Sequence, residues 1–252
     1  MTACERLRAD CGVVWQSLHE HPFIRELAAG TLPPVKFRFY IEQNLMYLPE
    51  YAKAMAAGVA KAPDVETMRW FAEALANVIE NEVPENRELL SRVVALGAED
   101  RGGAAEMAPA NLAYTSFLVA TALQHGALEI MAAIVPCTWS YGDIATGLGV
   151  ADHPVYAEWV RFFGSPAYGG IIGEMQARFD AMAADLSEEA LARLSSFFKA
   201  STRLERGFWD MAYRLEQWPD VREREDAEAI ALAVEAQHAT RNLKREDERG
   251  SH

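Results

Sequence analysis

The sequence has few of the residues that build disulfide frameworks or metal centres. Its 252 residues include three cysteines, Cys4, Cys11 and Cys137, and six histidines. The cysteines lack metal-type spacing, and their odd number is typical of free thiols in a reducing cytoplasm. The histidines form no HExxH, Glu-x-x-His or Cys/His cluster, although helical metal sites need such ligands. Gly-x-Gly-x-x-Gly and Walker sequences are missing as well. The sequence therefore predicts no metal and no cofactor.

Basic residues are also scarce. The 24 Lys and Arg are outnumbered by 37 Asp and Glu, which gives a net charge of −13 and a pI near 4.9. Nucleic acid binding depends on basic groups that neutralise phosphates, and anionic membranes attract basic surfaces, so neither partner is expected. The longest apolar run, LEIMAAIVPC, is too short to span a bilayer, and the N-terminal MTACERLRADCG has no apolar signal core. We therefore expect a cytoplasmic protein.

The alternation of Val, Ile and Thr that marks β-strands is almost absent. Ala is abundant, half of the residues are hydrophobic, and apolar residues recur at helical spacing. These patterns predict an all-α protein with a substantial core, and no linker or repeat divides residues 1–218, which form a single domain. The expected helices cover 2–19, a short segment closed by Gly30, 34–61, 64–97 with Pro84 as a kink, 110–134, 138–146, 154–163, 166–184 and a long one from Ser187.

The chain end differs from the rest in composition. Residues 219–248 are highly charged and carry only a weak apolar stripe with Ile230 and Val234. Two interpretations stay open: a solvated helix with a frayed end, or a helix that packs on a neighbouring subunit. Residues 249–252, RGSH, resemble the start of an affinity tag and are left out of the fold prediction.

One predicted helix carries an unusual polar stripe. Tyr40, Asn44, Tyr47 and Tyr51 follow at spacings of four, three and four, so they share one helix face. Each side chain needs a hydrogen-bond partner if it is buried. The stripe is either an aromatic core face with satisfied hydroxyls, or the wall of a pocket that stacks on a planar ring.

A second candidate is the stretch PCTWSYGDI. Cys137 and Tyr141 lie four residues apart on one predicted helix face, and Pro136 suits a helix start. A thiol at a helix N-terminus would be stabilised as the nucleophilic thiolate by the helix dipole. The alternative is that Cys137 is a small buried hydrophobic residue.

A third candidate is the stretch STRLERGFWDMAY. Glu205, Phe208 and Trp209 follow the i, i+3, i+4 pattern, so bulky aromatics flank one carboxylate. Desolvation would raise its pKa toward a range useful in acid–base catalysis. A surface glutamate paired with Arg203 or Arg206 is the alternative.

These stretches together resemble the TenA/thiaminase II family, whose fold is the heme-oxygenase-like helical bundle. The resemblance covers about residues 15–218. It is carried, in order, by HPFIRELAAGTLPPVKFRFYIEQNLMYLPEY, NLAYTSFL, IVPCTWSYGDI, HPVYAEWV and LERGFWDMAY. It implies an enzyme of thiamine salvage that hydrolyses aminopyrimidines to hydroxymethylpyrimidine, and a homotetramer.

The resemblance also implies roles for single residues. Cys137 matches the family nucleophile in PC-x-W-x-Y, and Glu205 matches the glutamate that exchanges a proton with a ring nitrogen. Substrate-binding positions correspond to Tyr47, Tyr114, Tyr141 and Phe208.

Two positions depart from the family pattern. Asn44 stands where an aspartate is usual, and Phe163 stands where a tyrosine is usual. An asparagine still offers an acceptor and a donor to the ring edge, but it has no charge. Both changes make the site less polar, so an altered substrate preference is expected. The alternatives are a same-fold enzyme acting on a different nitrogenous ring, such as a cofactorless oxidase, and a non-catalytic ligand-binding or regulatory protein.

Overall fold

The computed structural model describes residues 1–98, 106–149 and 153–223. Within these ranges all regular structure is helical and no strand occurs, which confirms the all-α prediction. The chain divides into a compact unit, Met1–Glu216, and a second unit, Gln217–His252. Residues 224–248 of the predicted extension and the tag-like residues 249–252 lie outside the described ranges.

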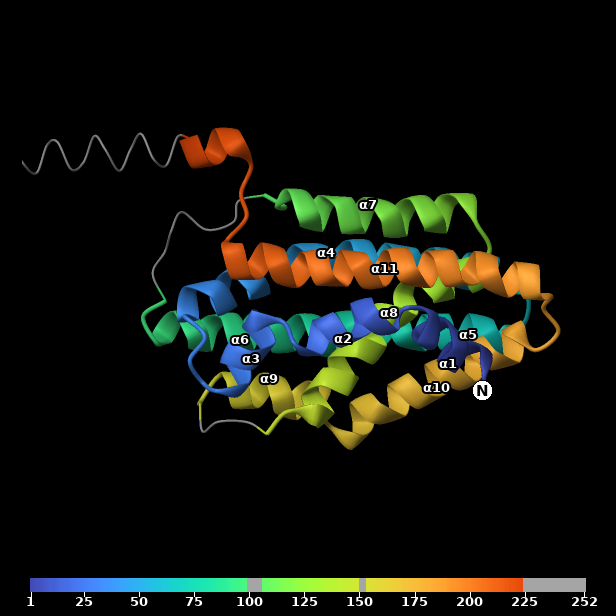
Figure 1. Cartoon of the computed structure of the whole chain (residues 1–252), viewed down its shortest axis with the longest axis horizontal. Helices are drawn as coiled ribbons and strands as arrows, with labels where there is room; N and C mark the ends of the chain where they lie inside the picture. The colour runs from blue at the N-terminus through green and yellow to red at the C-terminus, as the bar shows by residue number, and fades with distance from the viewer. Residues whose placement is uncertain (99–105, 150–152, 224–252) are drawn as a thin grey trace, which may run out of the picture. The chain divides into compact units, whose positions relative to one another are not determined.

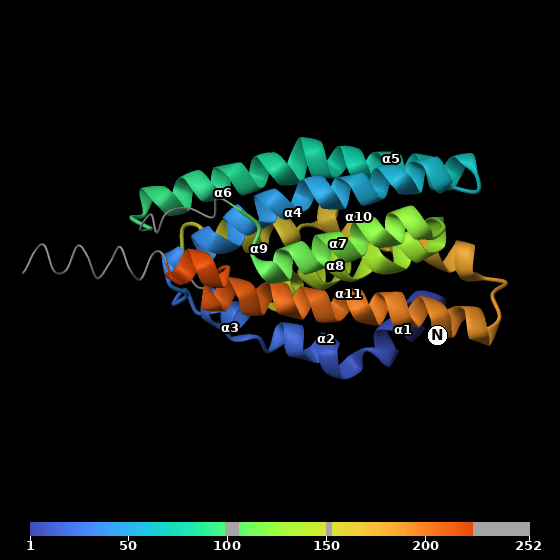
Figure 2. The same ribbon diagram turned by 90° about the horizontal axis from the view of Figure 1, so that it is seen from above.

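The longest helix, α4, spans Pro34–Lys61 and pairs with a rod made of three helical segments. The rod consists of α5 (Val65–Asn77), the π-helix η1 (Val78–Glu82) and α6 (Val83–Ala95), and it runs beside α4 in Figure 2. Asp64 caps α5 through the backbone N–H of Thr67, as its sequence position predicts. In place of a sharp kink, the wide π turn ends just before Pro84, whose missing N–H interrupts the regular helical hydrogen bonds.

Helix α8 (Ala127–Gly147) lies at the centre of the compact unit. It packs against α4 and three other helices: α7 (Pro109–Gln124), α10 (Pro166–Ala183) and α11 (Glu188–Arg214). Figures 1 and 2 show α11 alongside α7 and α8, with α10 on another side of α8. Its buried residues run nearly unbroken from Ile130 to Pro136, as expected of a helix enclosed by neighbours.

Shorter helices complete the compact unit. They are α1 (Ala3–Asp10), α2 (Gly12–His19), α3 (Pro22–Ala28) and α9 (Tyr156–Phe163). The single helix expected over 2–19 is therefore wrong: it breaks at Cys11, between Asp10 and Gly12, two residue types with low helix propensity.

The two helices expected over 110–134 and 138–146 are also wrong. The structure breaks the chain earlier, at His125 and Gly126, and then continues one helix through Pro136. Lys61 compensates the earlier break, because its Nζ donates to the main-chain oxygens of Ala122, Leu123 and His125 at the end of α7. A proline inside α8 was not expected, since proline usually ends a helix.

Close helix contacts at one glycine shape the interior next to α8. A Cβ placed on Gly142 would lie 2.2 Å from Ile172 Cδ1 and 3.4 Å from the ring of Tyr168, so only glycine fits there without a shift. This glycine lets α10 approach α8 closely and brings the buried Tyr168 ring against that of Phe163, at 5.1 Å between centroids.

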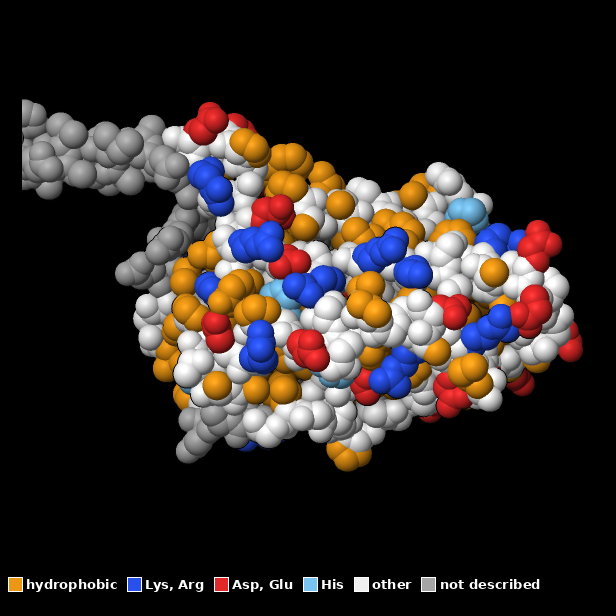
Figure 3. Space-filling view, in the orientation of Figure 1, with side chains coloured by type: hydrophobic (Ala, Val, Ile, Leu, Met, Phe, Trp, Pro, Cys, Tyr) orange, Lys and Arg blue, Asp and Glu red, His pale blue; other side chains and the backbone are white. Residues whose placement is uncertain are grey.

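The surface mixes charges of both signs. On the face shown in Figure 3, blue and red side chains alternate among apolar ones, and the described residues gather into no basic patch there. None of the described helices is long and apolar enough to cross a membrane.

Candidate functional site

The structure brings most of the predicted site residues together in the interior of the compact unit. Cys137 comes from α8, Glu205 from α11, Tyr114 from α7 and Tyr47 from α4. Cys137 keeps part of its surface accessible, whereas the preceding residues of α8 are buried. Side chains from four helices therefore meet around Cys137.

The predicted reason for a reactive thiol is wrong. Cys137 lies in the middle of α8, so no free helix N-terminus is available to stabilise a thiolate. Burial instead raises the pKa of the Cys137 thiol well above its ordinary value, and the carboxylates of Glu205 and Glu82 raise it further. The resting thiol is neutral, and it needs a base that removes its proton before it can attack.

Side chains from two other helices hydrogen-bond to carbonyl groups beside Pro136. Proline has no N–H to donate to the carbonyl of Ala132, and its ring widens that turn. Ser201 Oγ donates to the neighbouring Ala133 oxygen at 2.6 Å, and Tyr51 Oη donates to the Ile134 oxygen at 3.2 Å. These contacts from α11 and α4 hold the irregular turn of α8, directly before the cysteine.

Glu205 is 1% exposed and has no basic partner within the described residues, so the surface ion-pair interpretation is wrong. Its Oε1 lies 2.7 Å from Tyr114 Oη, which in turn lies 2.9 Å from Ser201 Oγ. Burial raises the pKa of Glu205 to about 7, against the lowering effect of hydrogen bonds with Tyr114 and Cys137. Glu205 can thus take up or release a proton near neutral pH.

Counting protons along this chain of contacts also favours a neutral Glu205. Three contacts join Glu205, Tyr114, Ser201 and the Ala133 carbonyl, but the two hydroxyls supply only two protons. An ionised Glu205 leaves the contact between Tyr114 and Ser201 without a proton. A protonated Glu205 donates to Tyr114, and all three contacts are then satisfied. The network can reverse its direction when Glu205 changes charge.

The ends and the middle of the polar stripe of α4 differ in how their hydroxyls are satisfied. Tyr40 and Tyr51, at its ends, have satisfied hydroxyls: Tyr40 Oη accepts from Trp159 Nε1 at 3.1 Å, and Tyr51 bonds to α8. The hydroxyl of Tyr47, in the middle, is buried without a hydrogen-bond partner of normal geometry, and it lowers the pKa of the nearby Cys137 thiol. Its ring packs between those of Tyr51 and Phe208, at 5.4 and 5.7 Å.

Asn44 is held in a defined orientation by a chain of amides. Asn86 Nδ2 donates to the main-chain oxygen of Glu82 at 2.8 Å, which leaves Asn86 Oδ1 as an acceptor. Asn44 Nδ2 donates to that oxygen at 2.9 Å. Because a main-chain carbonyl can only accept, the Glu82 carbonyl fixes the direction of both hydrogen bonds. Asn44 therefore uses one N–H of its amide internally, and its Oδ1 remains an acceptor.

The remaining predicted residues form an aromatic wall. The Tyr141 ring lies 4.9 Å from Phe163 and 5.2 Å from Trp209, and its hydroxyl accepts from Tyr40 Oη at 3.4 Å. Phe208 meets Tyr47 edge to face. Phe163 is buried and touches Tyr141 and Trp159, so its ring supports the wall through packing alone.

Glu82 was missed by the sequence prediction. Val78, Glu82, Asn86, Leu89 and Val93 form one inward-facing stripe of the η1–α6 rod, and all except Glu82 are fully buried. Burial raises the pKa of Glu82 to about 7, and the charge of Glu205 adds to the rise. The available sequence signal was that Glu82 and Asn86 are polar residues in an otherwise apolar stripe.

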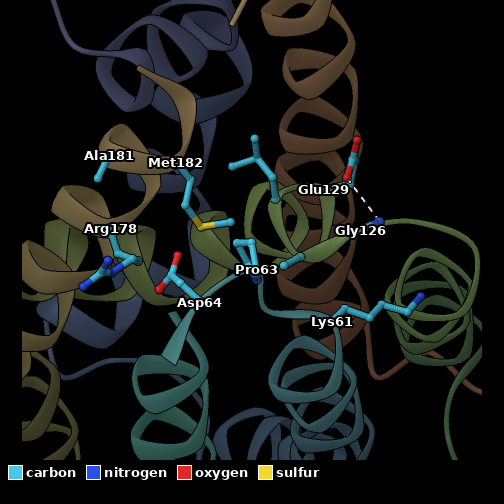
Figure 4. Close-up of a pocket in the computed structure, with 10 residues that line it drawn as sticks. Lys61, Pro63, Asp64, Gly126, Glu129, Arg178, Ala181 and Met182 are labelled. Carbon is cyan, nitrogen blue, oxygen red and sulfur yellow. Dashed lines mark hydrogen bonds between the residues drawn. The ribbon is translucent and has the colours of Figure 1, made fainter. Parts of the chain in front are cut away.

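A separate cavity of about 400 Å³ lies away from these residues, at one end of α8 (Figure 4). Its charged residues have structural partners: Asp64 caps α5, Glu129 caps α8 at Gly126, and Arg178 pairs with Glu66 at 3.3 Å. None of the predicted site residues lines it. In the described part of the chain, no three Cys, His, Asp or Glu side chains group as metal ligands would.

The chain belongs to the TENA/THI-4/PQQC family, whose model matches residues 9–215. An aminopyrimidine aminohydrolase of Halalkalibacterium halodurans is 34% identical over 209 residues, which cover 81% of this chain and 92% of that protein. An aminopyrimidine aminohydrolase of Bacillus subtilis is 32% identical over 222 residues, 87% and 93% of the two chains.

Solved structures of the family agree with the fold. A TenA homologue from P. horikoshii has 30% identity and a TM-score of 0.73, with 85% of this chain and 99% of that chain covered. A TenA family transcription regulator from a Silicibacter species has 27% identity and a TM-score of 0.75, with 84% and 96% covered. The expected family and fold are thereby confirmed.

The buried Glu205 predicts a pH-dependent stability. Its pKa of about 7 in the folded protein exceeds its ordinary value of 4.5. The folded state therefore binds more protons between these pH values, and stability is lost as the pH rises through about 7. Glu205→Gln removes this loss. The free energy of unfolding of the variant, minus that of the wild type, should increase by about 2–3 kcal/mol from pH 5 to pH 8.

Urea unfolding at both pH values measures this difference. Glu174→Gln serves as the control, because Glu174 is exposed to solvent, and its difference should stay constant. An equal difference for Glu205→Gln at pH 5 and pH 8 would mean that Glu205 is ionised throughout.

Proposed function

We propose that this protein is an aminopyrimidine hydrolase that replaces an amine on the methylene of a 4-amino-5-aminomethylpyrimidine with a hydroxyl. The observation that supports this most directly is the contact of the half-buried Cys137 with a buried carboxyl, Glu205, whose pKa is about 7. The curated relatives at 34% and 32% identity bear the name of this activity.

The first step uses the thiol and the carboxyl as a pair. Ionised Glu205 takes the proton of Cys137, and the thiolate adds to an electrophilic carbon of the pyrimidine ring. The same proton then passes from Glu205 to the adjacent ring nitrogen, so that the addition creates no net negative charge. Tyr114 donates to an ionised Glu205 and accepts from a protonated one, so this contact serves both protonation states of the carboxyl.

The next step breaks the bond to the amine. The lone pair of the ring 4-amino group pushes through the ring and expels the amine nitrogen with the electron pair of its C–N bond. The positive charge moves to the 4-amino group, whose N–H bonds become stronger donors. The Oδ1 of Asn44 is a suitable acceptor for them, and the bond to Asn86 fixes the orientation of the amide.

Water completes the exchange. It adds to the exocyclic methylene and loses one proton, which restores the neutral ring adduct. The ring nitrogen returns its proton to Glu205, the C–S bond breaks, and Glu205 gives the proton back to the sulfur. The sum is R–CH2–NH3⁺ + H2O → R–CH2–OH + NH4⁺. The rings of Tyr47, Tyr141 and Phe208 are positioned to pack on the planar pyrimidine.

Incubation with 4-amino-5-aminomethyl-2-methylpyrimidine tests the proposal. The wild type should release ammonia and hydroxymethylpyrimidine in equal amounts. Cys137→Ser should lower kcat by about 10³-fold or more, because a serine hydroxyl is a far weaker nucleophile next to a carboxyl with a pKa near 7. The matched control is Cys4→Ser, which removes another buried thiol, in α1. Absence of turnover by a folded wild type would contradict the proposed function.

The amide chain predicts that restoring an acid at position 44 is harmful. Asn44→Asp has no N–H for Asn86 Oδ1, so two oxygens would face each other unless Asn86 turns and gives up the Glu82 carbonyl. An unsatisfied buried group costs about 1–3 kcal/mol, so kcat/KM should fall about 10- to 100-fold. Asn81→Asp, on the exposed side of η1, should have no effect. A rise in kcat/KM for Asn44→Asp would show that charge at this position matters more than the orientation of the amides.

A further inference from the structure

Glu82 is a second carboxyl with a pKa of about 7, and the reaction above does not use it. It ends the π-helix η1, four residues after the buried Val78 and four before the buried Asn86. Its neighbours Ile79, Glu80 and Asn81 are exposed, so the carboxyl of Glu82 lies on the opposite, inward face of the rod. The wide turn of a π-helix supports this register, and such turns occur frequently at functional sites.

The inward face of the η1–α6 rod packs against α4, and the amide chain joins the Glu82 main chain to Asn44, one turn before Tyr47. The charge of Glu82 raises the pKa values of Cys137 on α8, of Tyr40 and Tyr51 on α4, and of Tyr168 on α10. These residues come from three different helices, so the charge of Glu82 acts on groups of α4, α8 and α10 together.

Glu82 has no hydrogen-bond or ion-pair partner among the described residues, and Asn86 bonds to its main-chain oxygen rather than to its carboxyl. The Tyr47 hydroxyl, 2% exposed and also next to Cys137, is likewise unpartnered. A carboxylate without a cation in an apolar interior is costly, and it is stabilised strongly by a ligand that brings a positive charge and N–H donors. The Glu82 carboxylate and the Tyr47 hydroxyl therefore fit a cationic group of the substrate.

We propose that Glu82 binds the primary ammonium group of the substrate and then accepts a proton from the water that replaces it. This deepens, and rests on, the function proposed above. A primary ammonium offers N–H bonds to the carboxylate, whereas a quaternary ring nitrogen as leaving group offers none. Glu82 thus selects aminomethyl substrates over substrates whose leaving group has no N–H.

The proton balance of this role closes. Ionised Glu82 holds R–CH2–NH3⁺ until the C–N bond breaks and the nitrogen leaves as NH3. The incoming water forms the new C–O bond and gives one proton to the Glu82 carboxylate. Glu82 then passes that proton to NH3, which departs as NH4⁺, and the carboxylate is regenerated. Glu205 is free to serve the thiol and the ring nitrogen throughout.

The test compares Glu82→Gln with Glu80→Gln, an exposed glutamate two residues away. For each variant, KM and kcat are measured with 4-amino-5-aminomethyl-2-methylpyrimidine, and the inhibition constant is measured for the neutral hydroxymethylpyrimidine. Glu82→Gln should raise KM for the amine about 10- to 100-fold, the usual effect of losing a hydrogen bond to a charged group, and should lower kcat. Its inhibition constant for the neutral ligand should stay within about threefold, because uncharged groups gain little from a carboxylate. Glu80→Gln should match the wild type.

The outcomes separate the two proposals. If Glu82→Gln weakens the amine and the neutral ligand equally, Glu82 only maintains the site, and its role as ammonium ligand is overturned. An unchanged KM and kcat would overturn it as well. No turnover by the wild type would instead overturn the proposed function and, with it, this role. A circular dichroism melt of Glu82→Gln verifies that the variant is folded.

Discussion

The burial of a thiol and two carboxyls without any cation is the constraint on which the site depends. Cys137, Glu205 and Glu82 share the interior of the helical bundle, and none has a basic partner within the described residues. Desolvation therefore raises the pKa of Cys137 well above its ordinary value and raises both carboxyl pKa values to about 7. The groups become useful for proton transfer because the fold gives them no counter-ion.

Two hydrogen-bond chains with different properties surround these groups. The chain from Glu205 through Tyr114 and Ser201 ends on the Ala133 carbonyl, and its hydroxyls can rotate. It adapts to a change of charge. The amide chain from Asn44 through Asn86 ends on the Glu82 carbonyl and cannot reverse without losing a bond. The first chain therefore suits acid–base chemistry, and the second suits recognition of a fixed pattern of donors.

Local signals in the sequence predicted much of the fold. The caps at Asp64 and Ser187 and the ends of α4 are set by neighbouring residues, so the pattern located them well. The course of α8 through Pro136 could not be predicted, because the compensating Ser201 and Tyr51 hydroxyls come from other helices. The motif identified the thiol. The helix N-terminus predicted to activate it is absent, because α8 continues through Pro136.

The sequence identified site residues where aromatic and polar side chains share a helix face. It missed Glu82, a single acid within an acidic stretch. Glu82 resembles its exposed neighbour Glu80 in sequence, and only the packing of the η1–α6 rod against α4 separates the two. Asn86 was overlooked in the same way. Its part in orienting Asn44 depends on a main-chain carbonyl that no side-chain pattern reveals.

The measurement that tests this account most directly is the pH dependence of alkylation of Cys137. Iodoacetamide labelling of the wild-type chain, followed by mass spectrometry of the peptide that contains Cys137, gives its rate separately from those of Cys4 and Cys11. If burial among carboxyls governs the thiol, the rate constant should still be rising above pH 9, the ordinary pKa of a cysteine. A rate that levels off below pH 8 would show a stabilised thiolate and would contradict the account.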